Sequence, residues 1–162
     1  MFVGTNQSNM YWVDTSSLTA ELKNTCHTEG VTQIAFAEGC SSVFGTAAGS
    51  DIRLWNTAKR QELVRIVVPN RTCLAMDFAK DGTLIVSGWD DGKIRAFMPE
   101  SGKKAFEIND SHRGGCTALC TTHDGKIVSG GFGGEVRVWA STQSHHMEAS
   151  LKEHTQRVNR II

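Results

Sequence analysis

Apolar and polar residues alternate along short stretches of this chain, and turn-forming residues separate the stretches. Cys116–Thr121 alternates in this way, and Lys126–Ser129 restores the alternation after the Asp-Gly pair at positions 124 and 125. Asp-Gly is a strong hairpin signal, because both central residues of such a turn need positive φ. A glycine-rich turn, Gly130–Gly134, then leads into a third strand-like stretch, Glu135–Trp139. Met147–Leu151 is the fourth such stretch. The pattern therefore predicts an antiparallel unit of four strands.

The same pattern recurs with a fixed period. Three segments that place an arginine two residues before an aromatic residue align with one another: Ser50–Trp55, Gly92–Phe97 and Gly134–Trp139. Their last residues are 42 positions apart in both intervals, and Val86–Gly88 and Val128–Gly130 are also 42 apart. A period of about 40–45 residues with four short strands is typical of β-propeller blades.

These repeats resemble WD repeats, whose blades carry a Gly-His pair, an Asp turn and a Trp-Asp ending. The resemblance implies an all-β fold, a WD40-type β-propeller segment with three complete four-stranded blades and partial blades at both ends. The expected boundaries are a partial blade over 1–23, blades over about 24–66, 67–108 and 109–152, and the start of the next blade over 153–162. Val158–Ile162 is expected to be a first strand. It could complete the blade begun at Met1 as a four-bladed ring, but an open arc is favoured.

In WD repeats, a His, a Ser or Thr, an Asp and the Trp link three strands by buried hydrogen bonds. This sequence offers eight residues for such networks: His27, Trp55, Ser87, Asp91, His112, Ser129, Trp139 and His154. Asn70 and Phe97 stand where the second complete blade should have its His and Trp. Gly45 and Gly49 stand at the Ser and Asp positions of the first blade, and Gly133 at the Asp position of the third. We therefore expect each blade to lack part of its network, with water or backbone groups as substitutes.

Several stretches resemble a narrower family, the WD-repeat proteins of motile cilia and flagella. They are Glu62–Cys73, Asp91–Phe97, His112–Gly114, Gly134–Trp139 and Leu151–His154. The resemblance covers nearly the whole chain and implies an interior segment of a much longer protein with two propellers. It also implies a structural role in the cytoskeleton of the axoneme, inside doublet microtubules, with tubulin and other luminal proteins as partners.

Composition argues against nucleic-acid binding and against a membrane-spanning segment. Lys+Arg and Asp+Glu both number 17, so the formal net charge is zero, whereas nucleic-acid binding usually needs a basic surface. No stretch approaches the roughly 20 consecutive apolar residues of a membrane span. Five cysteines without a C-x-x-C pair favour reduced thiols in the cytoplasm. The alternative function is a soluble cytoplasmic adaptor that recruits peptides into a signalling or ubiquitin-ligase complex, although no strongly basic loop cluster favours it.

Catalytic and metal-binding interpretations are weak. His112 is echoed by His154 one repeat later, which favours a buried structural histidine over a general base or a metal ligand. His145 and His146 have no companion ligand at a metal-binding spacing, so a solvated loop is expected. Gly130–Gly134 precedes a strand, whereas phosphate-binding loops open a helix. The sequence therefore predicts no enzyme, no metal, no cofactor and no small-molecule substrate.

The turns that carry the His and Asp positions lie on one face of a propeller, which is often its binding face. Four residues there are predicted partner contacts, because Arg, Trp and Phe are common interface anchors: Arg71, Trp89, Arg113 and Phe132. The counterpart of Trp89 one repeat later is Gly131, so the fold does not demand an aromatic residue there. The alternative is that Trp89 covers the central channel.

An arginine precedes the Trp position of each complete blade by two residues. These side chains, Arg53, Arg95 and Arg137, could form a repeated anion-binding ring. Because a guanidinium stacks well on an aromatic ring, we expect them instead to pack on the aromatic residue of the Trp position, between blades.

Overall fold

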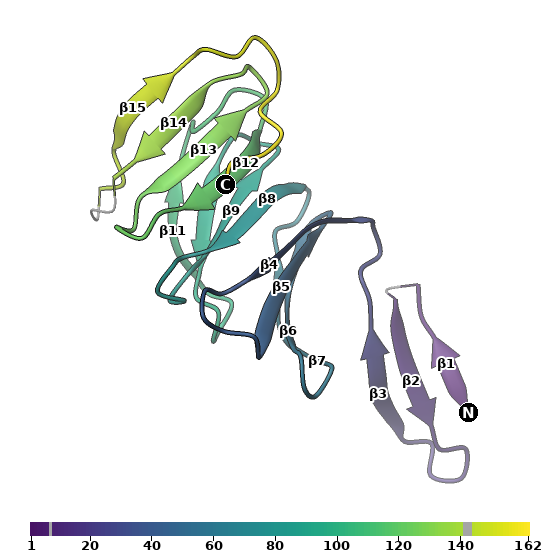
Figure 1. The fold of residues 1–162 in the computed structure, drawn as a ribbon. Coiled ribbons are helices and arrows are strands. Elements are labelled where there is room, and N and C mark those ends of the chain that lie inside the picture. Colours follow the sequence, from purple (N-terminus) through teal and green to yellow (C-terminus); the bar gives the residue numbers. More distant parts are fainter. Residues whose placement is uncertain (7, 141–143) are drawn as a thin grey trace.

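The computed structural model describes residues 1–6, 8–140 and 144–162, and its regular elements in these ranges are fifteen β-strands (Figure 1). The strands form four antiparallel sheets. The first sheet comprises β1 (Phe2–Gly4), β2 (Asn9–Val13) and β3 (Ala20–Thr25). The described residues contain no helix that could cross a membrane. The predicted all-β class is confirmed.

Each of the other three sheets is a four-stranded meander, in which every strand pairs with the next one along the chain. The first complete blade comprises β4 (Val31–Phe36), β5 (Val43–Ala48), β6 (Asp51–Asn56) and β7 (Gln61–Val67). The second comprises β8 (Cys73–Phe78), β9 (Ile85–Trp89), β10 (Ile94–Phe97) and β11 (Lys104–Ile108). The third comprises β12 (Cys116–Thr121), β13 (Ile127–Gly131), β14 (Val136–Trp139) and β15 (Met147–Leu151).

The hydrophobic core lies between the sheets rather than inside any one of them. One cluster joins Ile52 and Leu54 of the first complete blade to Met76 and Trp89 of the second. A second cluster joins the other face of the second blade to the third blade. Because neighbours cover both of its faces, the second blade has its central strands β9 and β10 fully buried, whereas β15 is exposed along its whole length.

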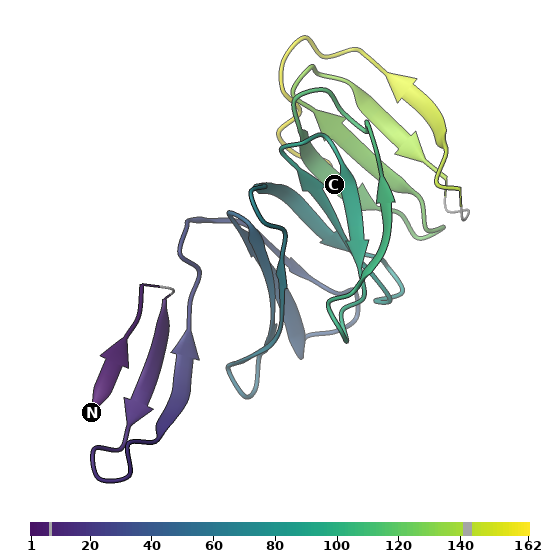
Figure 2. The same ribbon diagram turned by 180° about the vertical axis from the view of Figure 1, so that it is seen from behind.

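Hydrogen bonds that involve the first strands hold neighbouring blades in register. The Thr32 hydroxyl in β4 donates to the backbone carbonyl of Cys73 at 3.2 Å, and Thr117 in β12 donates to that of Val158 at 2.6 Å. Asp77 in β8 accepts from the backbone N–H of Thr121 at 2.9 Å. The three complete blades therefore follow one another as an arc, and the sheet that contains the N-terminus lies at the far end of the molecule (Figures 1 and 2).

The segment Val158–Ile162 is not a strand, which corrects the sequence prediction. Its Val158 N–H bonds the Gly131 carbonyl at 3.1 Å, just as the Cys73 N–H bonds the Gly49 carbonyl at 2.8 Å. Val158 thus takes, after the third blade, the position that Cys73 at the start of β8 takes after the first blade, but the contact does not continue as a ladder. The segment also lies far from β1, so these sheets do not close into a four-bladed ring (Figure 1). That 153–162 begins a further blade stays a prediction, which the Val158 contacts support.

Glycine conformation in the β9–β10 turn yields a stability prediction. Gly92 and Gly82 both have positive φ, +73° and +72°, but a Cβ at Gly92 would overlap the His112 carbonyl oxygen, whereas one at Gly82 would meet nothing within 4 Å. Gly82→Ala should cost about 1–2 kcal/mol of unfolding free energy, for the left-handed backbone alone. Gly92→Ala should cost at least about 3 kcal/mol, because backbone must also move. Thermal and urea unfolding of the two variants would measure the difference, and equal losses would contradict it.

Candidate functional site: buried blade networks and the face of their turns

The third complete blade carries a four-residue hydrogen-bonded network. The Trp139 indole N–H donates to Ser129 Oγ at 2.8 Å, and His112 Nε2 lies 2.8 Å from the same oxygen. His112 Nδ1 lies 3.2 Å from Glu135 Oε1. Because Ser129 already accepts from the indole, its own proton is free for Nε2, so a neutral His112 donates from Nδ1 to the carboxylate. The network is therefore complete, and the acid is Glu135 rather than a residue at position 133, where the sequence has Gly133.

Burial and hydrogen bonding together set the protonation states in this network. Burial lowers the pKa of His112 from its ordinary value of 6.5, although the hydrogen bond to Glu135 opposes the shift. Burial alone would raise the pKa of Glu135, but hydrogen bonds from its own backbone N–H and from His112 outweigh it and lower the pKa. Near neutral pH the pair is therefore a neutral imidazole and a carboxylate.

The first complete blade also has a full network, which corrects the expectation that two glycines interrupt it. His27 Nε2 and the Trp55 indole N–H lie 2.6 and 2.8 Å from Thr46 Oγ1. His27 Nδ1 lies 2.7 Å from Asp51 Oδ1. The hydroxyl and acid positions thus belong to Thr46 and Asp51, not to Gly45 and Gly49.

A shorter turn explains that error. Thr46 pairs with Arg53, seven residues on, whereas Ser129 pairs with Arg137, eight residues on. The β5–β6 hairpin is one residue shorter, so counting back from the tryptophan by a constant interval falls on the wrong side chain. The acid follows the arginine instead, since Asp51 and Glu135 each precede it by two residues. That spacing is the signal by which both acids could have been found.

The second complete blade uses a different arrangement around the same hydroxyl. The Trp89 indole N–H donates to Ser87 Oγ at 2.9 Å, and Ser87 in turn donates to the Arg95 carbonyl at 2.9 Å. Phe97 is buried at the Trp position without an N–H, so Trp89 supplies the donor that Phe97 lacks. Asn70, expected at the His position, is exposed in the preceding turn with a φ of 60°. Trp89 is wholly buried, so its prediction as an exposed partner contact is wrong.

Asp91 lies in the β9–β10 turn and pairs with arginines rather than with a histidine. Arg95 donates to both of its oxygens, at 3.0 and 2.6 Å, and Arg71 Nε lies 3.5 Å away. Burial alone would raise the pKa of Asp91, but the hydrogen bonds and charge of Arg95 outweigh it and lower the pKa. Asp91 therefore ties the turn to β10 as a carboxylate.

The arginines before each Trp position have mostly polar partners, unlike the predicted stacking. Arg53 contacts Asp51 at 2.6 Å and Glu62 at 3.1 Å, and Arg137 donates to the backbone carbonyls of Asp110 and Ser111. Arg95 does lie over an aromatic ring, 5.5 Å from the ring centroid, but the ring is that of Trp89.

The remaining predicted contacts lie at one end of the blades, in turns before a first strand or between the second and third strands. Arg113 is exposed, Phe132 is 44% exposed, and Arg71 keeps half of its side chain in solvent. The Arg157 guanidinium lies over the Phe132 ring at 5.0 Å from the centroid, which adds a cation–π contact to this face. His154 is exposed near the same end. Their role in partner binding stays a prediction.

Within the described ranges, no cluster of three or more His, Cys, Asp or Glu side chains could hold a metal ion. All five cysteines are free thiols. Burial raises the pKa of Cys73 strongly and that of Cys116 to about 12, so both remain protonated core side chains.

Repeated antiparallel blades joined through their faces define a β-propeller protein. Residues 27–162 match the model of the family described as IP5P C-F beta-propeller, and the chain belongs to this WD-type β-propeller family. Cilia- and flagella-associated protein 52 of Mus musculus is 50% identical over 162 residues, and that of Chlamydomonas reinhardtii is 47% identical over 162 residues. In both cases 99% of this chain and 26% of the relative are covered, so the chain spans about a quarter of the length of these curated relatives.

More distant similarities extend the comparison. Echinoderm microtubule-associated protein-like 2 of Mus musculus is 30% identical over 135 residues, covering 79% of this chain and 20% of the relative. A solved structure entitled "Structure of U3-55K" superposes with a TM-score of 0.74 at 20% identity, covering 83% of this chain and 43% of that one. At such low identity, this last likeness shows the fold alone.

Removal of the central hydroxyl should destabilise the third blade. Ser129→Ala leaves the Trp139 N–H and His112 Nε2 buried without a partner, so we expect a loss of about 2–4 kcal/mol in unfolding free energy. Ser101→Ala, at an exposed turn, is the matched control and should change it by less than about 0.5 kcal/mol. Denaturant unfolding gives both values, and similar losses would show that the network adds no stability.

Lowering the pH should also reduce the stability of the fold, because His112 becomes protonated. Its folded pKa is lowered, so the unfolded state binds more protons once the pH falls through the ordinary value of 6.5. The contribution is therefore fully present above about pH 6.5 and is lost as the pH falls below it. We expect the melting temperature to drop between pH 7 and 5.5, and the drop to shrink in His112→Gln but not in His123→Gln, at an exposed histidine. An unchanged drop in His112→Gln would refute this origin.

Proposed function

We propose that this chain belongs to a non-enzymatic structural protein of motile cilia and flagella. In this role it binds tubulin and other luminal proteins and stabilises axonemal doublet microtubules. The observation that carries the proposal is the similarity over 99% of the chain to proteins named for cilia and flagella, in both a mammal and an alga. The weaker similarity to a protein named as microtubule-associated supports a microtubule partner.

The organisation of the described residues supports a scaffold role. The polar groups buried at the centre of each complete blade bond to one another, so they are engaged in holding strands together rather than free for chemistry. Exposed arginines and Phe132 at the turn face offer contacts suited to a protein surface. A rigid propeller with exposed residues that bind other proteins is suited to a structural role in a filament.

Cell fractionation tests the proposal. The full-length protein, tagged and expressed in a ciliated cell, should remain with the axoneme after detergent extraction. It should also resist a salt wash that strips proteins from the outer surface of the doublets, because luminal proteins are shielded from that wash. A diffuse signal that detergent extracts completely would contradict the axonemal role, and would favour the cytoplasmic peptide-recruiting adaptor.

A further inference from the structure

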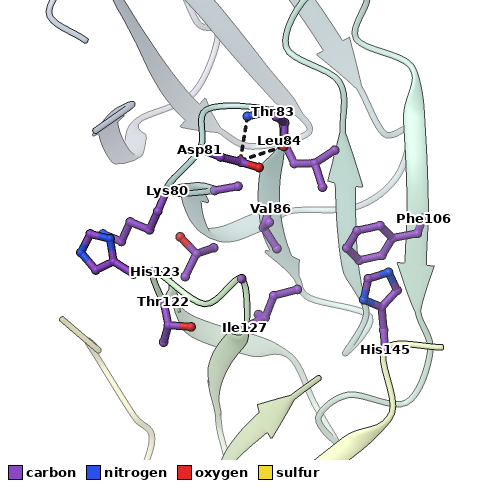
Figure 3. A pocket seen from close by; sticks show the side chains of 13 residues that line it. Lys80, Asp81, Thr83, Leu84, Val86, Phe106, Thr122, His123, Ile127 and His145 are labelled. Atoms are coloured by element: carbon purple, nitrogen blue, oxygen red, sulfur yellow. Dashed lines mark hydrogen bonds between the residues drawn. The ribbon is translucent and has the colours of Figure 1, made fainter. Parts of the chain in front are cut away.

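A pocket lies between the second and third complete blades, at the end of the sheets opposite the network turns (Figure 3). The β8–β9 and β12–β13 turns meet there, whereas the networks use the turns between second and third strands. Its floor consists of apolar side chains from both blades: Leu84, Val86, Phe106 and Ile127. The pocket therefore forms only where two blades pack together.

The size of this pocket suits one large side chain. Its volume is about 230 Å³, which is below the roughly 300–1,000 Å³ of most small-molecule sites. Val86 and Ile127 at the floor are 2% and 4% exposed, so the floor is rigid core rather than mobile surface. Pockets of this kind receive the anchor residues of protein interfaces.

One wall of the pocket is a histidine ring that stacks across the boundary between the two blades. The His145 ring stacks on Phe106 with centroids 3.7 Å apart and planes 21° apart, so a residue of the third blade closes over the second (Figure 3). This replaces the solvated position expected for His145. Its Nδ1 atom is buried and has no hydrogen-bond partner among the described residues. Because this nitrogen is covered, an occupant of the pocket contacts the stacked ring rather than this atom.

The rim next to the opposite wall offers a cation. Lys80 Nζ lies 3.7 Å from Glu38 Oε2, a distance too long for a direct hydrogen bond. The Asp81 carboxylate at the same rim is held within its own turn, where it accepts from Thr83 N at 3.0 Å and Thr83 Oγ1 at 2.8 Å. The Lys80 ammonium, whose ion pair with Glu38 is long, can therefore turn to an incoming carboxylate at this rim.

We propose that this pocket is a docking site for a protein partner that inserts one large aliphatic side chain. The residue that follows in the partner carries a carboxylate, which meets Lys80, and the aliphatic side chain packs against the His145 ring. The site goes beyond the axonemal assignment and does not depend on it, because a partner segment of this chemistry would fit in either cellular setting.

Weak peptide binding can test the site directly. The probe is the blocked tetrapeptide acetyl-Gly-Leu-Glu-Gly-amide, with matched peptides that carry Ala for Leu or Gln for Glu. Binding to the full-length protein is measured by saturation-transfer NMR at millimolar peptide. We expect binding of the Leu-Glu peptide, about tenfold weaker binding of the Ala peptide through lost apolar burial, and about threefold weaker binding of the Gln peptide through the lost ion pair.

Two variants place the binding at this pocket. Lys80→Gln should abolish the preference for Glu over Gln, and His145→Ala should weaken binding of all three peptides several-fold. Lys59→Gln and His154→Ala, at exposed positions away from the pocket, are the matched controls and should change nothing. Melting temperatures of all four variants verify that they fold. The proposal is overturned if the Leu-Glu peptide shows no saturation transfer, or if Lys80→Gln and His145→Ala bind all peptides as the unchanged protein does.

Discussion

One buried hydroxyl group at the centre of each complete blade determines how the strands of that blade are held together. Thr46, Ser87 and Ser129 occupy this position in β5, β9 and β13, and each accepts an indole N–H at 2.8 to 2.9 Å. The indole comes from the Trp position in two blades and from Trp89 in the second. A buried hydroxyl is stabilising only when its donor and acceptor functions are both used, and this requirement, rather than any one aromatic position, is common to the three blades.

The position of the hydroxyl also determines which residue faces the next blade, because successive residues of a strand point to opposite faces of the sheet. The residue after it faces the following blade and is small in every case: Ala47, Gly88 and Gly130. A Cβ at Gly88 would lie 2.5 Å from the Cys116 sulfur, and one at Gly130 would lie 2.6 Å from Val158 Cβ. The hydroxyl thus bonds within the network on one face of the sheet. The small residue after it leaves room for the chain segment that packs against the other face.

The sequence was sufficient for the fold and for part of the site, and the division has a physical basis. The 42-residue period and the Asp-Gly turns indicated the blades, because local turn chemistry and alternation repeat in each of them. The network residues required exact register, and a turn one residue shorter displaced the prediction from Thr46 to Gly45. Trp89 was misplaced for another reason. Its indole substitutes for a donor that Phe97 lacks, and such compensation across a hairpin leaves no periodic signal.

The two ends of the blades are under different constraints, and this difference bears on where binding specificity can arise. At the network end, His112 and Asp91 bond to their own blades, so the turns there vary mainly in outward side chains such as Arg113 and Phe132. At the opposite end, short Asp-Gly turns hold themselves together, and the residues beside them are free to differ between blades. His145 uses that freedom: it crosses from the third blade to stack on Phe106 and leaves one nitrogen unpaired over an apolar floor. A feature that the repeat does not require, built on a core that the repeat makes rigid, is the kind of position where a family of similar propellers can acquire different partners.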